Sequence, residues 1–441
     1  MKKLLVLFLL ATTLCVAQDS QYKKLTDFFN LLEENDKAMG SISILQEGNL
    51  VYTNSIGYQY KTENNKELAS KNTKYRIGSI TKMFTATIIF QLVDEGKIEL
   101  TDLLSEYFPK VPNASKITIA NLLNHSSGLF NLTNSEDFGE WMENPTNTKE
   151  MLSRIYATKV LFEPEERNEY SNTNYLILGY ILEQIDGATY ASILNKRIIK
   201  KLALKNTNYG TKIDINNNES QSYLYLNESW TQSATETHMS VPGGAGAIVS
   251  TSSDLVVFID ALFSGKLLSD TSFASMTSAK GDFGSGIFKM EVEGNIIFGH
   301  EGGIDGFQSM LIYIPAQKTA IALTLNAINY GLKPIMLNAV SASLNADFDL
   351  PAFTRIDITV EEIKKYAGVY SSDETFFNLV FEANGTILKG APEGSNLKEL
   401  VPTKKNQFTF DTLQIVLDFD PEAGTVIFTK GEDAPILFYK Q

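Results

Sequence analysis

Strand patterns stand at both ends of a largely helical segment, and this order limits the folds that the chain can adopt. Apolar and polar residues alternate over 41–45 and 50–52 around the turn Glu47-Gly48-Asn49, which is typical of a β-hairpin. Three more strand patterns follow much later, at 295–299, 309–314 and 319–324. We therefore predict an α+β fold in which one antiparallel sheet is flanked by helices and carries a helical insertion.

A very apolar helix pattern runs from Met83 to Val93 and closes at Gly96. It is apolar on nearly every face, so we expect this helix to lie buried inside a domain. Ser79 and Lys82 stand where it begins. Residues three apart share a helix face, so the Lys82 amine can approach the Ser79 oxygen. Burial and the positive end of the helix dipole disfavour the ammonium form, which makes Lys82 a candidate base for a Ser79 nucleophile.

The Ser-x-x-Lys pattern is weak evidence by itself, because the chain also contains it at Ser20 and at Ser395. Ser20 lies near the chain start and Ser395 in a polar turn, whereas Ser79 opens the buried helix. The structural alternative is that Ser79 only caps the helix and that Lys82 is solvated. The other motifs must decide between these interpretations.

The segment Tyr170-Ser171-Asn172 directly precedes an apolar helix pattern at 175–182. Loop residues just before a buried helix are well held, so the Tyr170 phenol can shuttle a proton. The Asn172 amide can bond to a substrate carbonyl or to Lys82. The alternative is an ordinary capping loop with Asn172 as a turn residue.

His300 is one of three histidines and stands on a predicted strand. Gly302 and Gly303 follow it and leave room for a substrate alongside the strand. The Gly303 amide can serve with the Ser79 amide as an oxyanion hole. A lone histidine is more often a structural residue, and we assign that role to His125.

The C-terminal part differs from the rest of the chain. At 441 residues the chain exceeds what one hydrophobic core usually supports, and its pattern breaks near 345–358. From Tyr366 onward, short strand patterns alternate with Gly, Pro and Asn turns, which predicts a small antiparallel β barrel or sandwich. We place a first domain at 18–350 and a second at 359–441.

Residues 1–17 have the features of a signal peptide, with two early lysines, an apolar stretch and the small residue Ala17 at the end. We predict its cleavage and an exported protein, periplasmic or secreted. The apolar stretch is shorter than the roughly 20 residues that span a bilayer, so no membrane span is expected after cleavage. Lipidation of Cys15 is the weaker alternative. Cleavage would remove Cys15, the chain's single cysteine, and with it any disulfide or thiolate chemistry.

Charge and missing motifs exclude several function classes. A formal net charge of -14 disfavours nucleic acids and anionic lipid surfaces as partners. The sequence has no Gly-x-Ser-x-Gly elbow, no paired-histidine metal motif and no cysteine pair. The glycine-rich stretch 242–246 fits no nucleotide fingerprint, and we interpret it as a tight turn under the site. We predict no metal and no cofactor, a small-molecule or peptide substrate, and leave the oligomeric state open.

The motifs at Ser79, His125, Tyr170 and His300 occur in one order, and by them the chain resembles the penicillin-recognising serine hydrolases. This family includes class C β-lactamase-like enzymes, D-alanyl-D-alanine carboxypeptidases, D-aminopeptidases and related esterases. The resemblance spans residues 22 to 345 and implies a β-lactamase/transpeptidase-like fold. It also implies that Ser79 is the acylated nucleophile and that Lys82 and Tyr170 share the general-base role. By the same resemblance, His300 stands on the strand that borders the site. The C-terminal segment resembles a lipocalin-like β domain.

The third motif departs from the family pattern. Many of these enzymes have Lys-Thr-Gly or Lys-Ser-Gly where this chain has His300-Glu301-Gly302. An imidazole is largely neutral near pH 7 and Glu301 adds negative charge, although strand alternation can aim Glu301 away from the site. We therefore expect an acyl hydrolase for D-amino-acid amides, peptides or esters. The alternatives are a β-lactamase and, in another class, a non-catalytic cell-wall or β-lactam binding or sensing protein.

Overall fold

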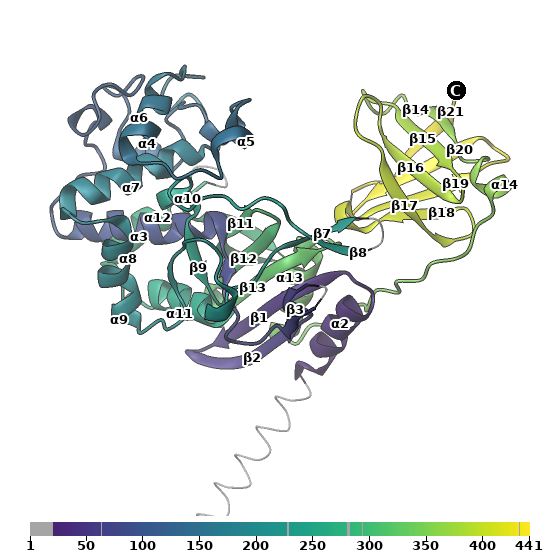
Figure 1. The fold of residues 1–441 in the computed structure, drawn as a ribbon, viewed down its shortest axis with the longest axis horizontal. Coiled ribbons are helices and arrows are strands. Elements are labelled where there is room, and N and C mark those ends of the chain that lie inside the picture. Colours follow the sequence, from purple (N-terminus) through teal and green to yellow (C-terminus); the bar gives the residue numbers. More distant parts are fainter. Residues whose placement is uncertain (1–20, 63, 227–228, 280–282, 293, 432) are drawn as a thin grey trace, which may run out of the picture. The chain divides into compact units, whose positions relative to one another are not determined.

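The computed structural model describes residues 21–441 except 63, 227–228, 280–282, 293 and 432 (Figure 1). The predicted signal peptide at 1–17 lies outside the described residues. The chain divides into two units. The second unit contains Ile328–Ile335 and Phe348–Gln441, and the first contains the remaining residues up to Asp347.

The first unit is built on a six-stranded sheet with the strand order β10-β11-β12-β13-β1-β2 (Figure 1). The strands are β1 (Ala38–Gln46), β2 (Asn49–Ile56), β10 (Phe288–Val292), β11 (Asn295–Ile304), β12 (Phe307–Ile314) and β13 (Thr319–Ile328). Strands from both ends of the segment are thus neighbours in one sheet, with β1 next to β13. The predicted sheet with a helical insertion is confirmed.

Smaller strands and the helices complete the first unit. The strands are β3 (Tyr58–Lys61) with β4 (Lys66–Leu68), β5 (Tyr75–Arg76) and β6 (Asn208–Tyr209) on either side of β9 (Ile248–Ser250), and β7 (Tyr223–Leu226) with β8 (Ser229–Gln232). The helices are α2 (Lys23–Glu34), α3 (Thr81–Asp94), α4 (Ile119–Leu123), α5 (Phe138–Trp141), α6 (Thr148–Tyr156), α7 (Asn172–Asp186), α8 (Tyr190–Leu194), α9 (Lys200–Leu202), α10 (Gly243–Gly246), α11 (Ser252–Phe263) and α12 (Asp270–Thr277). Helix α13 (Leu332–Ser343) follows the last strand of the sheet; its residues from Met336 on belong to the first unit and its first four to the second.

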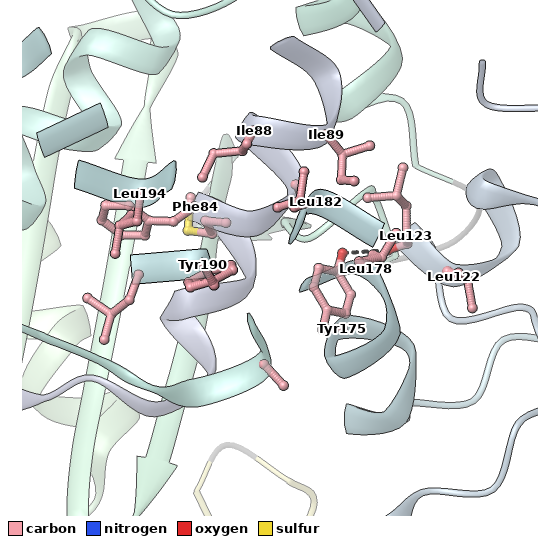
Figure 2. Close-up of a cluster of buried hydrophobic side chains, with 14 of the residues drawn as sticks. Phe84, Ile88, Ile89, Leu122, Leu123, Tyr175, Leu178, Leu182, Tyr190 and Leu194 are labelled. Atoms are coloured by element: carbon pink, nitrogen blue, oxygen red, sulfur yellow. Dashed lines mark hydrogen bonds between the residues drawn. The ribbon is translucent and has the colours of Figure 1, made fainter. Parts of the chain in front are cut away.

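Helix α3 lies inside the core of the first unit, as its apolar sequence predicts. Every residue from Thr81 to Leu92 is buried. Figure 2 shows side chains of this helix packed against those of α4, α7 and α8, namely Phe84, Ile88 and Ile89 with Leu122, Leu123, Tyr175, Leu178, Leu182, Tyr190 and Leu194. Full burial of one such aliphatic or aromatic side chain contributes roughly 1.5–3 kcal/mol. The residues that open α3 therefore stand on a firmly packed element.

The second unit contains a closed eight-stranded barrel, which confirms the predicted C-terminal antiparallel barrel. A short helix α14 (Val360–Ile363) precedes it. Its strands are β14 (Gly368–Ser371), β15 (Leu379–Asn384), β16 (Ile387–Pro392), β17 (Lys398–Lys404), β18 (Gln407–Phe410), β19 (Ile415–Asp420), β20 (Thr425–Lys430) and β21 (Ile436–Lys440). Aromatic rings fill its core, with Phe419 5.0 Å from Phe381 and 5.6 Å from Phe408 between centroids. Side chains fill a barrel of this strand number.

Among the described residues, no helix combines the length and the apolar composition that crossing a membrane requires.

Candidate active site

Glycines bring the turn that carries Ser79 against strand β11. Ser79 lies in a 3-10 turn, Gly78–Ile80, directly before α3. Gly78 has a φ of 49°, and a Cβ atom there would lie 2.8 Å from the Gly303 amide nitrogen. A Cβ atom on Gly302 would lie 2.0 Å from the Ile77 carbonyl oxygen. Neither contact leaves room for a side chain, so the two backbones meet only because these positions are glycine.

The Ser79 hydroxyl lies between an amine and a phenol. Its Oγ is 2.8 Å from Lys82 Nζ and 2.8 Å from Tyr170 Oη. Lys82 also donates to Asn172 Oδ1 at 2.8 Å and to the Ala245 carbonyl at 2.8 Å. These two oxygens can only accept, so they use two N–H groups of Lys82. A neutral amine held in this way keeps its lone pair for the hydroxyl proton of Ser79.

Burial sets the charge state of this pair. Lys82 is fully buried, and desolvation holds its pKa well below the ordinary value of 10.5. Burial raises the pKa of Tyr170 above 10.0, and its hydrogen bond with Ser79 opposes the rise. Both shifts favour a neutral amine beside a neutral phenol. Lys82 is therefore suited to accept a proton from Ser79, and Tyr170 is suited to donate one.

His300 is buried near the rings of Tyr170 and Phe288. It is 4% exposed, and its Nδ1 lies 2.5 Å from the Glu301 carbonyl oxygen. Its ring centroid is 6.2 Å from that of Tyr170 and 4.7 Å from that of Phe288. Burial lowers the pKa of His300 to about 3, so the ring is neutral. Glu301 is exposed, as strand alternation allows.

The two predicted glycines of β11 have different surroundings. Gly303 lines the same cavity as Ser79, and its amide lies beside Gly78. This placement fits the predicted pairing of the Ser79 and Gly303 amides as an oxyanion hole. Gly302 is buried against Ile77 and contributes space for close packing.

A cavity of about 380 Å³ opens beside Ser79, and its walls are mostly apolar. The apolar side chains come from the insertion, from the segment before α10 and from the end of strand β11: Leu132, Phe138, Trp141, Met142, Met151, Leu176, Val241, Pro242 and Ile304. Asp305 also lines it, but this carboxylate is bonded to the buried Arg76 guanidinium at 2.6 Å. No lysine or arginine side chain is among the described residues that line the cavity. The cavity is thus suited to an apolar group and lacks a cation for a carboxylate.

The loop at 124–134 holds Asn172 in place, a function that sequence reasoning missed. Asn131 Oδ1 accepts a hydrogen bond from the Asn172 backbone amide at 3.1 Å. Thr133 Oγ1 accepts one from the Asn172 side-chain amide at 3.1 Å, which turns Oδ1 toward Lys82. Clustered polar residues between two buried helix patterns were the available signal. Such clusters usually mark turns, so that signal does not identify a site.

The glycine-rich stretch forms the short helix α10 beneath Lys82. The Ala245 carbonyl accepts from Lys82, and the Gly244 carbonyl accepts from Thr85 Oγ1 at 2.6 Å. It thus presents acceptors to α3, whereas a phosphate would need donors. Within the part of the chain that the structure describes, no three His, Cys, Asp or Glu side chains are grouped so that they could hold a metal ion.

Comparison with known proteins places these features in a family. The Beta-lactamase family matches residues 28–331. The chain is 26% identical over 448 residues to Penicillin-binding protein 4* of Bacillus subtilis (strain 168), which covers 95% of this chain and 96% of that protein. A D-stereospecific amidohydrolase from Streptomyces sp. superimposes with a TM-score of 0.61 at 29% identity, covering 70% of this chain and 96% of that one.

A further structure shares the fold along nearly the whole chain. The octameric penicillin-binding protein homologue from Pyrococcus abyssi has a TM-score of 0.67 at 22% identity, with 94% of this chain and 99% of that chain covered. The family match includes Ser79, Lys82, Tyr170 and His300. These findings confirm the predicted relationship to penicillin-recognising serine hydrolases. The chain belongs to the Beta-lactamase family and is a serine hydrolase.

Proposed function

We propose that this chain is an exported serine acyl hydrolase that forms an acyl-enzyme on Ser79 and acts on D-amino-acid amides, peptides or esters. The contact of Ser79 Oγ with both Lys82 and Tyr170, each at 2.8 Å, carries the proposal. Similarity to a D-stereospecific amidohydrolase supports the substrate class. The signal-peptide pattern at 1–17 supports export.

Acylation begins when Ser79 Oγ attacks the substrate carbonyl carbon and passes its proton to the neutral Lys82 amine. The carbonyl π electrons move to oxygen, and the Ser79 and Gly303 amides donate to this oxyanion. When the tetrahedral intermediate collapses, the bond to the leaving amine or alcohol breaks. The leaving group takes a proton from Tyr170, and the Lys82 ammonium, whose Nζ lies 4.9 Å from the Tyr170 ring centroid, then returns a proton to the phenolate.

Deacylation uses the same groups in reverse roles. A water molecule attacks the acyl carbon and gives its proton to the neutral Lys82 amine, either directly or by way of the Tyr170 phenol, which passes its own proton to Lys82 as it takes one from water. The ester bond to Ser79 then breaks, and Ser79 Oγ recovers a proton from Lys82. Asn172 holds the amine through both half-reactions, because its Oδ1 lies 2.8 Å from Nζ.

The cavity supports the choice of substrate. Its volume of about 380 Å³ lies within the range of small-ligand sites. Phe138, Trp141 and Met151 offer an apolar surface for a bulky side chain or acyl group. The Arg76 guanidinium is bonded to Asp305, which lines the cavity, and to Glu236, so it is unsuited to bind a substrate carboxylate. An amide or ester with an apolar side chain fits better than a free C-terminal acid.

A substrate panel tests the proposal. It contains D- and L-phenylalanine amide, a D-Ala-D-Ala peptide, a short acyl ester and a chromogenic cephalosporin, each with the parent enzyme and with Ser79→Ala. We expect the D-amide and the ester to turn over faster than the D-Ala-D-Ala peptide, and Ser79→Ala to be inactive with the fold retained. Preferred hydrolysis of the cephalosporin would favour the β-lactamase alternative. A permanent adduct without turnover would favour the binding or sensing protein.

A further inference from the structure

Both chain neighbours of Tyr170 are anchored to one buried residue, His125. The His125 carbonyl oxygen accepts a hydrogen bond from the Glu169 amide at 2.9 Å. Its ring Nδ1 accepts one from the Ser171 amide at 3.1 Å. The two rings are also in contact, because the His125 centroid lies 4.5 Å from that of Tyr170. His125 therefore holds the backbone on both sides of Tyr170 and also contacts the Tyr170 ring, although it belongs to another segment of the chain.

His125 is itself firmly held. It is 2% exposed, and its φ of 61° lies in the left-handed region, where histidine is tolerated better than most residues. The Asn174 side-chain amide lies 3.3 Å from Nδ1, and its oxygen accepts from Ser127 Oγ at 2.7 Å. Because Nδ1 accepts from the Ser171 amide, the ring proton is on Nε2. Burial keeps the pKa of His125 well below its ordinary value, so the lone pair on Nδ1 stays available.

We propose that His125 is a positioning residue that sets the Tyr170 phenol against Ser79 through the Ser171 amide. This inference rests on the proposed function, in which Tyr170 moves the proton. The phenol must stay in hydrogen-bond range of Ser79 Oγ, from which it is 2.8 Å away. A displacement of about 1 Å can reduce the rate of such a step about 10²-fold.

Two variants distinguish the role of His125 as a hydrogen-bond acceptor for the Ser171 amide from the role of its ring contact with Tyr170. His125→Asn keeps an oxygen acceptor at the δ position, tolerates positive φ and loses the ring contact. His125→Phe keeps a ring and loses the acceptor. Ser126→Ala is the matched control, because Ser126 is a buried residue of the same loop whose hydroxyl bonds to Asn121 and Asn124 and not to His125, Asn174 or Tyr170. Thermal unfolding of each variant shows how much stability it has lost.

The readouts are the labelling rate of Ser79 by a fluorophosphonate probe, and kcat and KM for a short acyl ester. They are taken well below each melting temperature. We expect His125→Phe to label about 10²-fold more slowly with an unchanged KM. His125→Asn should keep most of the rate. Ser126→Ala should lose stability and keep its labelling rate.

The inference is overturned if His125→Phe labels at the parent rate, or if the rates of all three variants fall in proportion to their loss of stability. Should His125→Phe fail to fold, His125→Asn decides alone: most of the rate retained supports the acceptor role, and a loss of about 10²-fold overturns it. The proposed function fails separately, because labelling that persists in Ser79→Ala would reject the nucleophile whatever the His125 variants do.

Discussion

Substituting Gly302 by alanine should force apart strand β11 and the turn that carries Ser79. The added Cβ would lie 2.0 Å from the Ile77 carbonyl oxygen and 2.5 Å from Ser309 Oγ. Neither atom is free to move, because Ser309 Oγ donates to that same Ile77 carbonyl at 2.9 Å. Overpacking of this kind costs roughly 1–3 kcal/mol, so we expect the free energy of unfolding to fall by about 2 kcal/mol. The Ser79 turn should shift with Ile77, and kcat should fall as well.

The neighbouring glycine provides the control. The atoms nearest to a Cβ on Gly303 would belong to the Gln308 side chain, with its amide nitrogen at 3.3 Å and its amide oxygen at 3.4 Å. Gly303 is exposed and neither glycine has a positive φ, so both substitutions are free of backbone strain. We therefore expect Gly303→Ala to stay within about 0.5 kcal/mol of the parent protein.

Urea unfolding followed by tryptophan fluorescence measures the difference. The chain has two tryptophans, Trp141 and Trp230, and both lie in the first unit, so the signal reports the unit that contains the site. The midpoint for Gly302→Ala should lie clearly below that for Gly303→Ala at an equal slope. Equal midpoints for the two variants would refute the close packing of β11 against Ile77 on which the site geometry depends.

Three further predictions concern protons. Tyr170→Phe should lower kcat by roughly 10²–10⁴-fold at an unchanged melting temperature, because the variant lacks the phenol proton. Steady-state kinetics with an acyl ester measures this change, and a variant that keeps the parent kcat would contradict the prediction. The fluorophosphonate labelling rate should rise with pH and level off well below pH 10.5, because burial lowers the pKa of Lys82; a rise that continues to pH 10.5 would contradict it. His300 has a pKa of about 3 in the fold against 6.5 ordinarily, so the folded state binds fewer protons between these values. Its contribution to stability is complete above pH 6.5 and is lost as the pH falls from 6.5 toward 3, by roughly 2 kcal/mol at pH 5. The urea midpoint of His300→Gln should therefore depend less on pH than that of the parent protein. If both midpoints depend equally on pH, protonation of His300 is not the cause of the loss of stability.

Most of the fold could be predicted from the local periodicity of apolar residues in the sequence. The hairpin at 41–52, the buried helix after Ser79 and the short C-terminal strands each have a pattern that is complete within a few residues. Such patterns predict element type because burial imposes them on each segment separately. The closeness of Ser79 and Lys82 follows from helix geometry in the same way.

The cavity and the supporting loop could not be predicted in this way. Phe138, Trp141 and Met151 come from short helices of the insertion, and no period in the sequence shows that they face Ser79. The bond between Arg76 and Asp305 joins residues 229 positions apart, so it depends on the completed sheet. The ring of His125 bonds to a backbone amide rather than to a reacting group, and one sequence contains no sign of such a contact.

The assignment of Ser79 as nucleophile is tested most directly by mass spectrometry. The parent protein and Ser79→Ala are treated with a fluorophosphonate probe, and intact masses are followed by peptide mapping. The geometry of Ser79 between Lys82 and Tyr170 predicts a single adduct on the peptide that contains Ser79, and no adduct on Ser79→Ala. An adduct on another residue, or equal labelling of Ser79→Ala, would contradict the account.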